Sequence, residues 1–170
     1  MSSDYCHSST NASSSQNRSD TSAEFLPYPY TTKTAAPSSA KLIELPQHMA
    51  KDLTAEELNI VNQIDTLAFD QAGCRMTQRK LEENFATQGN NDEFSACLLY
   101  VLIDILPDVM TNQFGNYLCQ KLIEVLSVES LKKLVHAILP SVVEVSMDLH
   151  GTRAIQTLVE VLGNEPGALK

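Results

Sequence analysis

Long hydrophobic runs are missing from this 170-residue sequence, whose longest apolar stretch covers only the eight residues from Ala96 to Ile103. A helix that crosses a bilayer needs about 20 apolar residues. The stretch is therefore interpreted as a buried helix, and no membrane partner is expected. The sequence also lacks a secretory apolar segment at its N-terminus, which favours a cytoplasmic location.

Residues that could carry catalysis or bind metal are few and scattered. Cysteine occurs four times, at Cys6, Cys74, Cys97 and Cys119. These positions show no paired spacing of metal ligands, so the cysteines are interpreted as reduced thiols. His136 and His150 are isolated, and no phosphate-binding loop or nucleophile motif occurs. We expect neither an enzyme nor a bound metal or cofactor.

Positive charge is also scarce, because 12 lysines and arginines face 21 acidic residues and give a net charge of -9. This balance argues against a nucleic-acid ligand, since neutralising phosphates usually supplies much of the affinity. A protein can nevertheless be basic on one face and acidic elsewhere. Five basic residues cluster around a repeated motif, namely Arg75, Arg79, Lys80, Lys121 and Arg153.

The motif occurs three times at nearly regular intervals. Its copies are Gly73-Cys-Arg-Met-Thr-Gln78, Gly115-Asn-Tyr-Leu-Cys-Gln120 and Gly151-Thr-Arg-Ala-Ile-Gln156. The glycines lie 42 and 36 residues apart, a period at which helical units stack into a solenoid. The aliphatic positions vary in identity while the glutamine is constant, and an unpaired buried amide would cost about 1–3 kcal/mol. The glutamines are therefore expected to face an open surface.

Helical spacing predicts which side chains accompany each glutamine, because residues four apart share one helix face. The pairs are Cys74 with Gln78, Asn116 with Gln120, and Thr152 with Gln156. A flat side chain able to stack lies between the members of each pair, and these are Arg75, Tyr117 and Arg153. Single-stranded RNA offers the complementary features, a hydrogen-bonding edge and a stacking face on every base.

The motif and its flanks resemble the Pumilio/FBF (PUF) repeat family. The matching segments are Asp70-Gln-Ala-Gly-Cys-Arg-Met-Thr-Gln, Asn112-Gln-Phe-Gly-Asn-Tyr-Leu-Cys-Gln and Asp148-Leu-His-Gly-Thr-Arg-Ala-Ile-Gln. The resemblance runs from about Leu58 to Leu162. It implies an all-α, right-handed solenoid in which each repeat reads one base of single-stranded RNA.

The resemblance also implies a base for each repeat. Cys74 with Gln78 would bind adenine, Asn116 with Gln120 would bind uracil, and Thr152 with Arg153 and Gln156 would bind adenine. RNA runs antiparallel to the repeats in this family, so the reading is 5′-AUA-3′, the 3′ end of a UGUANAUA-like element. The implied role is binding of mRNA 3′ untranslated regions to regulate translation and mRNA stability, with protein partners in translational repression or deadenylation.

Two alternatives stay open. Helical pairs of the HEAT or armadillo kind recur at similar periods and bind proteins, although they require no constant glutamine. A short set of repeats could also act as a protein-interaction module with little RNA affinity.

The domain organisation follows from composition. Residues 1–50 are dominated by Ser, Thr and Asn and then by a Pro/Tyr/Thr stretch, which predicts a disordered tail. Its serines could be phosphorylated or its tyrosines could form a partner motif, but an inert tail is the simpler interpretation. Residues 51–170 would hold three repeats, at about 54–90, 91–128 and 129–165, forming an incomplete Pumilio homology domain.

Several local signals predict helix boundaries. Thr54-Ala-Glu-Glu57 has the form of a capping box, Gln88 to Glu93 is rich in turn residues, and Pro140 should interrupt or restart a helix. No strand pattern alternates with the helices. Family members typically carry eight repeats, so three repeats are expected to leave an apolar end uncapped. The domain is then expected to be marginally stable or aggregation-prone.

Overall fold

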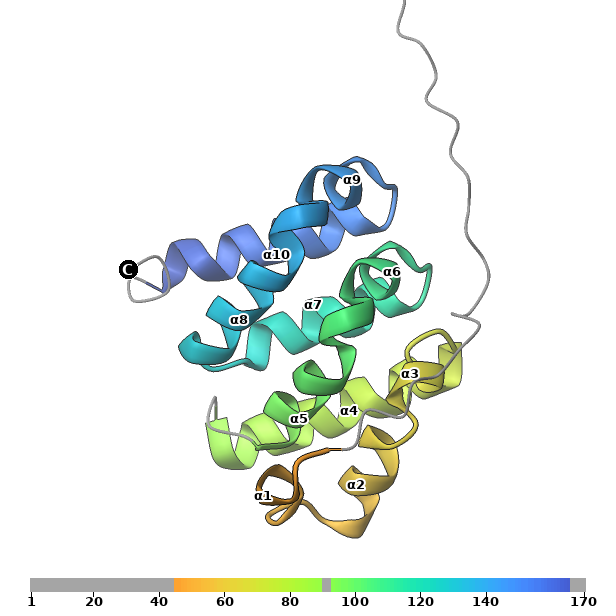
Figure 1. Ribbon diagram of the computed structural model, residues 1–170, viewed down its shortest axis with the longest axis vertical. Helices are drawn as coiled ribbons and strands as arrows, with labels where there is room; N and C mark the ends of the chain where they lie inside the picture. Colours follow the sequence, from red (N-terminus) through yellow and green to blue (C-terminus); the bar gives the residue numbers. More distant parts are fainter. Residues whose placement is uncertain (1–44, 90–92, 166–170) are drawn as a thin grey trace, which may run out of the picture. The chain divides into compact units, whose positions relative to one another are not determined.

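The computed structural model describes residues 45–89 and 93–165, which contain helices and no strand. In chain order the elements are α1 (Gln47–Ala50), α2 (Ala55–Val61), α3 (Ile64–Leu67), α4 (Gln71–Gln88), α5 (Glu93–Leu102), the 3-10 turn η2 (Ile103–Ile105), α6 (Leu106–Thr111), α7 (Gly115–Val125), α8 (Val128–Ile138), the 3-10 turn η3 (Leu139–Ser141), α9 (Val142–Met147) and α10 (Gly151–Asn164) (Figure 1). The all-α prediction is confirmed.

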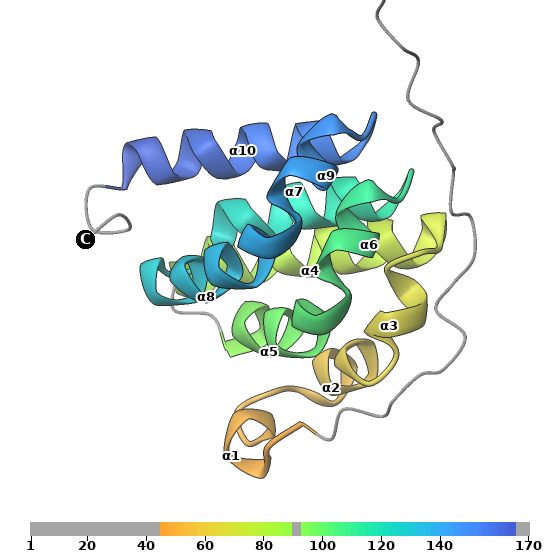
Figure 2. The same ribbon diagram turned by 45° about the horizontal axis from the view of Figure 1, so that its top comes forward.

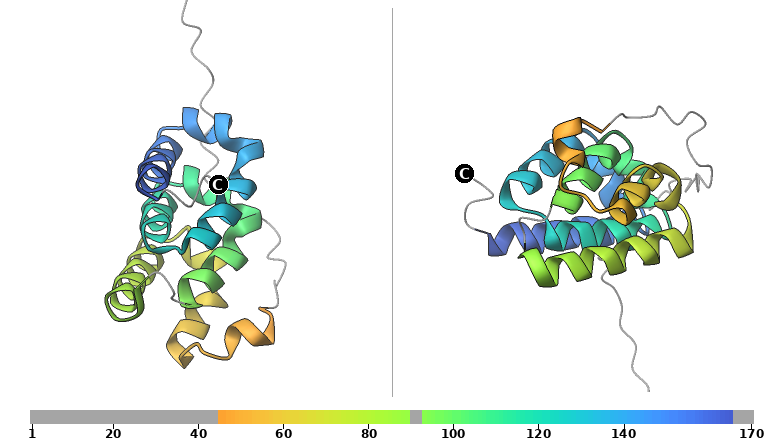
Figure 3. Two further views of the ribbon diagram at one scale, coloured as in Figure 1. Left: turned by 90° about the vertical axis from the view of Figure 1, so that its left-hand side faces the viewer. Right: turned by 90° about the horizontal axis from the view of Figure 1, so that it is seen from below.

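The helices form two layers. Helix α7 packs between α4 and α10, and these three helices, called the motif helices below, lie side by side in one row (Figures 2 and 3). Helices α5 and α8 pack against each other in the second layer, with the short helices around them. Leucine and isoleucine side chains from both layers fill the core between them. This is a solenoid of helical repeats.

Polar caps explain where the helices of the first repeat begin. The Thr54 hydroxyl accepts from the Glu57 amide while the Glu57 carboxylate accepts from the Thr54 amide, which confirms the capping box. Asp70 accepts from the Gly73 amide at 2.7 Å and starts α4.

Pro140 lies in η3, between the end of α8 and the start of α9, so the predicted interruption is confirmed.

Two boundaries differ from the predictions. Helix α1 lies inside the predicted tail, because Leu45, Met49 and Leu53 pack against the core of the first repeat. Helix α4 extends 15 residues past Gly73, whereas α7 ends 10 residues past Gly115. The interval between Gly73 and Gly115 is therefore longer than the next one mainly because α4 is longer than α7. Helix α4 ends at Gly89, whose φ is 66°. Three segments lie outside the described residues: 1–44 of the predicted tail, 90–92 of the predicted turn, and 166–170.

Helices α5 and α6 join through η2 into one helical stretch, Glu93–Thr111, longer than the apolar run seen in the sequence. By length and composition alone this stretch could cross a membrane. Half of it is buried inside the protein, and side chains such as Phe94 and Leu102 have no exposed surface. These contacts are those of a core helix.

A buried carboxylate joins α2 to the first motif helix. Glu57 accepts hydrogen bonds from the Thr54 hydroxyl at 2.7 Å and from Asn84 Nδ2 at 2.5 Å. Burial is the largest influence on its pKa and opposes ionisation, but the hydrogen bonds from Asn84 and Thr54, together with the charge of Lys80, outweigh it. The pKa of Glu57 is therefore lowered.

We predict that Glu57→Gln lowers the free energy of unfolding more at neutral pH than in acid. The folded-state pKa lies below the ordinary value of 4.5, so this stabilisation is present above that value and is lost as pH falls through the folded pKa. Thermal unfolding of both proteins between about pH 3 and about pH 7 measures it. Glu160→Gln, at an exposed position of α10, is the control, and a pH-independent difference for Glu57→Gln would contradict the prediction.

Candidate functional site

The three copies of the motif lie in the first turns of the three motif helices: the second and third copies begin α7 and α10, and the first starts two residues inside α4. A polar residue three positions before each glycine caps the turn, because the side chains of Asp70, Asn112 and Asp148 accept from backbone amides at the start of α4, α7 and α10. In each copy the glycine amide therefore donates to the side chain three residues earlier. The caps place equivalent side chains at equivalent positions along the row.

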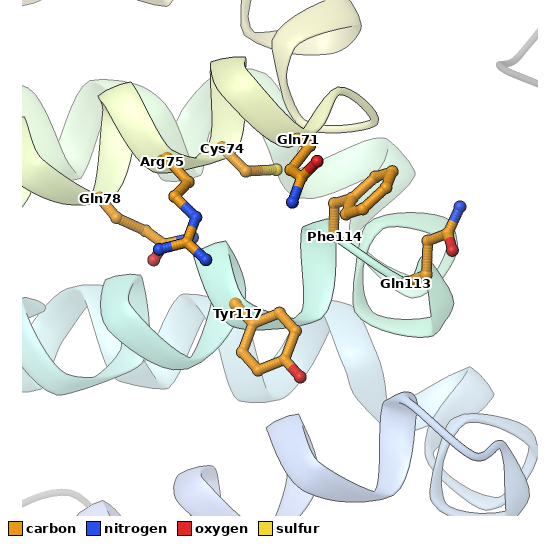
Figure 4. A pocket seen from close by; sticks show the side chains of 7 residues that line it. All are labelled: Gln71, Cys74, Arg75, Gln78, Gln113, Phe114 and Tyr117. Carbon is orange, nitrogen blue, oxygen red and sulfur yellow. The ribbon is translucent and has the colours of Figure 1, made fainter.

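A hollow of about 350 Å³ lies between α4 and α7. It is lined by Gln71, Cys74, Arg75, Gln78, Gln113, Phe114 and Tyr117 (Figure 4). Arg75 lines it from α4 and points toward α7, Tyr117 lines it from α7 with its ring directed away from α4, and Tyr117 is 57% exposed. The hollow is thus bounded by one flat side chain from each of two consecutive repeats. A flat aromatic ligand could stack between them.

The first pair, Cys74 and Gln78, lines this hollow from α4. Cys74 is only 2% exposed, and its thiol donates to the carbonyl oxygens of Leu67 at 3.5 Å and Ala68 at 3.2 Å. Burial, with a smaller contribution from the charge of Asp70, raises the pKa of Cys74 to about 12. The thiol is therefore neutral near pH 7 and is a poor nucleophile. Gln78 is half-buried beside it.

The second pair, Asn116 and Gln120, is joined by a hydrogen bond between its own side chains. Asn116 has no exposed surface, and its Nδ2 donates to the carbonyl oxygens of Asn112 at 2.9 Å and Gln113 at 3.1 Å. Its Oδ1 accepts from Gln120 Nε2 at 3.1 Å. A ligand that hydrogen-bonds to the Asn116 amide must replace these internal hydrogen bonds with hydrogen bonds to itself.

The third pair is the most accessible. Gln156 is exposed and Thr152 is half-buried, and Arg153 is exposed like Arg75 and Tyr117. The expectation that the constant glutamines face an open surface holds fully for Gln156 and partly for Gln78 and Gln120, which are half-buried.

The first members of two pairs, Cys74 and Asn116, are buried. Both are buried because the glycine before each lets the preceding helix lie very close. At Gly115 an added Cβ would come within 2.8 Å of the carbonyl oxygen of Ala68, in the preceding repeat.

The charges along the motif helices are mixed. Lys121 pairs with Glu124 at 2.7 Å and with Glu82 of α4 at 3.2 Å. These hydrogen bonds raise the pKa of Lys121, the bond to Glu124 most. Lys80 pairs with Glu56 at 3.1 Å. The expected basic face is therefore neutralised at both lysines, and among the described residues the exposed arginines Arg75, Arg79 and Arg153 form no ion pair.

Three residues that line the hollow were missed by the sequence analysis: Gln71, Gln113 and Phe114. Their signal was available, because Gln71 precedes Cys74 by three residues and so shares its helix face. Within residues 45–89 and 93–165, no group of three or more His, Cys, Asp or Glu side chains is arranged to hold a metal ion.

Comparisons with known proteins agree on one family. The model of the Pumilio-family RNA binding repeat matches residues 63–88, 106–139 and 141–165, together half of the chain. Pumilio homolog 12 of Arabidopsis thaliana is 39% identical over 102 residues, which cover 58% of this chain and 16% of that protein. Suppressor protein MPT5 of Saccharomyces cerevisiae is 37% identical over 100 residues, covering 58% and 11%.

Solved structures give the same result. The RNA-binding domain of yeast Puf5p bound to AAT2 RNA matches with a TM-score of 0.53 and 30% identity, over 65% of this chain and 28% of that one. The Puf4 RNA binding domain bound to the HO endonuclease RNA 3′ UTR recognition sequence matches with a TM-score of 0.50 and 35% identity, over 56% and 28%. The chain thus spans less than a fifth of the two relatives and less than a third of the two solved chains.

Proposed function

Because this chain belongs to the Pumilio family of RNA-binding repeat proteins, we propose that it binds single-stranded RNA along the row of motif helices, with one base at each repeat. The observation that carries the proposal is the hollow between Arg75 and Tyr117, which joins two stacking side chains to the hydrogen-bonding amide of Gln78. A base in the hollow would be stacked on both faces and contacted at its edge.

The proposed reading is 5′-AUA-3′, taken from the 3′ end of a UGUANAUA-like element. Adenine lies against Cys74 and Gln78, because the small thiol leaves room for a purine beside the glutamine amide. Uracil lies against Asn116 and Gln120, whose two amides supply donors and acceptors for its Watson–Crick edge. The third repeat binds adenine through Thr152 and Gln156, with Arg153 as the stacking side chain.

The proposed biological role is regulation of translation and mRNA stability in the cytoplasm through mRNA 3′ untranslated regions. Two solved relatives are PUF domains bound to RNA, one of them to a 3′ UTR recognition sequence. Protein partners in translational repression or deadenylation belong to the same proposal. No catalytic step is part of it.

A second candidate function rests on a separate observation. The apolar side chains Leu139, Val143 and Met147 follow one another at intervals of four residues along η3 and α9, and all three are exposed. Such a stripe suits a protein partner. The short chain would then act as a protein-interaction module with little RNA affinity.

Replacement of Tyr117 by alanine distinguishes RNA binding from the protein-interaction function. Tyr117→Ala is expected to weaken binding to an RNA containing UGUAAAUA by roughly tenfold, because stacking on an aromatic side chain contributes about 1–3 kcal/mol per base. The control is Tyr100→Ala, which removes a 39% exposed tyrosine from α5 in the other layer. Fluorescence anisotropy at low and physiological salt measures both.

The same titration with the final AUA changed to CCC tests base recognition. RNA reading predicts that the wild-type protein binds the AUA RNA more tightly than the CCC RNA, and that Tyr117→Ala weakens binding to the AUA RNA while Tyr100→Ala does not. Equal affinity for the two RNAs, or an equal effect of the two tyrosine substitutions, would favour the protein-interaction module.

A further inference from the structure

Each motif helix has two sides that can contact a neighbouring repeat. The leading side faces the preceding repeat, and the trailing side faces the following repeat. Helix α7 uses both sides, because it packs between α4 and α10. Within residues 45–89 and 93–165, no motif helix lies on the leading side of α4 or on the trailing side of α10 (Figure 3).

The trailing side of α10 exposes an apolar side chain that the other two motif helices bury. Leu81 of α4 and Ile123 of α7 have no exposed surface, whereas Val159, eight residues after its motif glycine as they are, is 63% exposed. In the second layer, Val143 and Met147 of α9 are exposed at the same end of the stack. This end therefore carries the apolar surface of a repeat interface.

The leading side of α4 shows the corresponding exposure at the other end. Met76 is 43% exposed, whereas Leu118 and Ala154, at the same motif position in α7 and α10, have no exposed surface. Those two helices each have a motif helix before them, so Met76 lies on the leading side of α4. Helix α1 packs mainly against α5, in the second layer, and leaves Met76 exposed.

The charges at the two ends are complementary. Inside the chain, Glu82 on the trailing side of α4 pairs with Lys121 of α7 at 3.2 Å. Its counterpart on α10 is Glu160, and the counterpart of Lys121 on α4 is Arg79. Both counterparts are exposed, and neither forms an ion pair with a described residue. One end thus offers the acid and the other end the base of the internal pair.

We propose that copies of this chain associate head to tail, with the trailing side of α10 in one copy packed against the leading side of α4 in the next. Val159 packs against Met76 and Glu160 pairs with Arg79, in the arrangement that joins α4 to α7. A second copy is the partner because both complementary surfaces belong to this chain. The contact is heterologous and open, so further copies can add, and they extend the row of motif helices.

The first test is sedimentation velocity of the full chain without RNA, from about 10 μM to about 1 mM. The 18.7 kDa monomer is expected at the lowest concentration, and species of two and more chains at higher concentrations. Val159→Lys is expected to weaken association by about a hundredfold or more, because it buries an unpaired charge. The control is Tyr100→Lys, at the 39% exposed tyrosine of α5, which should associate like wild type.

Mixing two variants tests the head-to-tail arrangement. Met76→Lys damages only the leading side and Val159→Lys only the trailing side, so neither protein should associate alone. Their mixture should form a one-to-one complex and nothing larger, because each supplies the surface that the other lacks. Circular dichroism checks that both variants are folded.

Reversal of charge tests the register of the contact. Arg79→Glu and Glu160→Arg are each expected to weaken association by about tenfold, because each places like charges together. The double variant Arg79→Glu/Glu160→Arg should associate like wild type, since the pair is restored with its signs exchanged.

Three outcomes would overturn the inference. The first is a monomer at every concentration, and the second is association that Val159→Lys leaves unchanged. The third is failure of the two lysine variants to combine or of the double charge variant to recover, which would assign association to other surfaces. These measurements contain no RNA and change none of the proposed base-contacting residues, so their failure leaves the proposed function standing. Failure of RNA binding in the Tyr117→Ala experiment likewise leaves this inference standing.

Discussion

Replacement of Gly115 by alanine is expected to lower the free energy of unfolding by roughly 3 kcal/mol, at the upper end of what overpacking costs. An added Cβ would come within 2.5 Å of the carbonyl oxygen of Val109 and within 2.8 Å of that of Ala68. Both atoms belong to the backbone, so relief requires movement of helices rather than rotation of a side chain. Urea or thermal unfolding monitored by circular dichroism measures the loss.

The matched control is Gly163→Ala. Gly163 lies in α10, and an added Cβ there meets no atom within 4 Å. Alanine is favoured over glycine in a helix interior by about 1 kcal/mol, so this variant should be as stable as wild type or slightly more stable. Equal unfolding midpoints for the two alanine variants would show that the packing of α7 against Val109 and Ala68 does not need the close approach at Gly115.

Gly115 also shows what the sequence could and could not reveal. The repeated motif identifies the glycine, but a glycine before a helix can serve as a turn, as a cap or as a site of close approach. Its backbone φ is not positive, whereas that of Gly89 is. The reason for the glycine is therefore its close approach to the carbonyl oxygen of Val109, in the preceding helix of the same repeat, and to that of Ala68 in the preceding repeat. The motif alone does not identify either neighbour.

Local signals predicted local features well. The capping box at Thr54, the interruption at Pro140 and the helical character of all three motif segments depend on residues within a few positions of one another. Helical periodicity also separates the exposed Tyr117 from the buried Leu118 next to it.

Features that depend on the distance between helices were not predictable in the same way. Periodicity indicates that Asn116 and Gln120 share a face, but not that α4 and its preceding turn lie close enough to bury Asn116. The internal hydrogen bond between the two amides follows from that burial, since a buried polar group needs a partner. Helix α1 was missed for a related reason, because its few apolar side chains gain stability only from the core they touch.

The end of the row after α10 shows how repeats depend on their neighbours. Ile123 of the second repeat is fully buried, while its counterpart Val159, 36 residues later, is 63% exposed. Val143 and Met147 are exposed as well, whereas their counterparts Pro107 and Thr111 are half-buried. The third repeat thus covers an apolar surface of the second and leaves the same surface of its own uncovered.

Replacement of Asn116 by serine is expected to change the base preferred at the second repeat from uracil to adenine. The wild-type asparagine supplies an amide edge that uracil can pair with, and it fills space that a purine would need. Serine removes the amide and can donate its hydroxyl to the carbonyl oxygen of Asn112, four residues earlier. The small Cys74 and Thr152 at the equivalent positions indicate that the fold accepts such a side chain.

Competition anisotropy between RNAs that end in AUA and AAA measures the change in preference. A lost or gained amide contact contributes about 1–3 kcal/mol, so preference is expected to shift by about tenfold or more toward AAA. Asn62→Ser, at an exposed position after α2, should leave the preference for AUA unchanged. Because Asn116 is buried, thermal unfolding must first show that the variant is folded. A folded Asn116→Ser protein that still prefers AUA would assign uracil selection to Gln120 alone, with Asn116 acting only to position it through the bond at Oδ1.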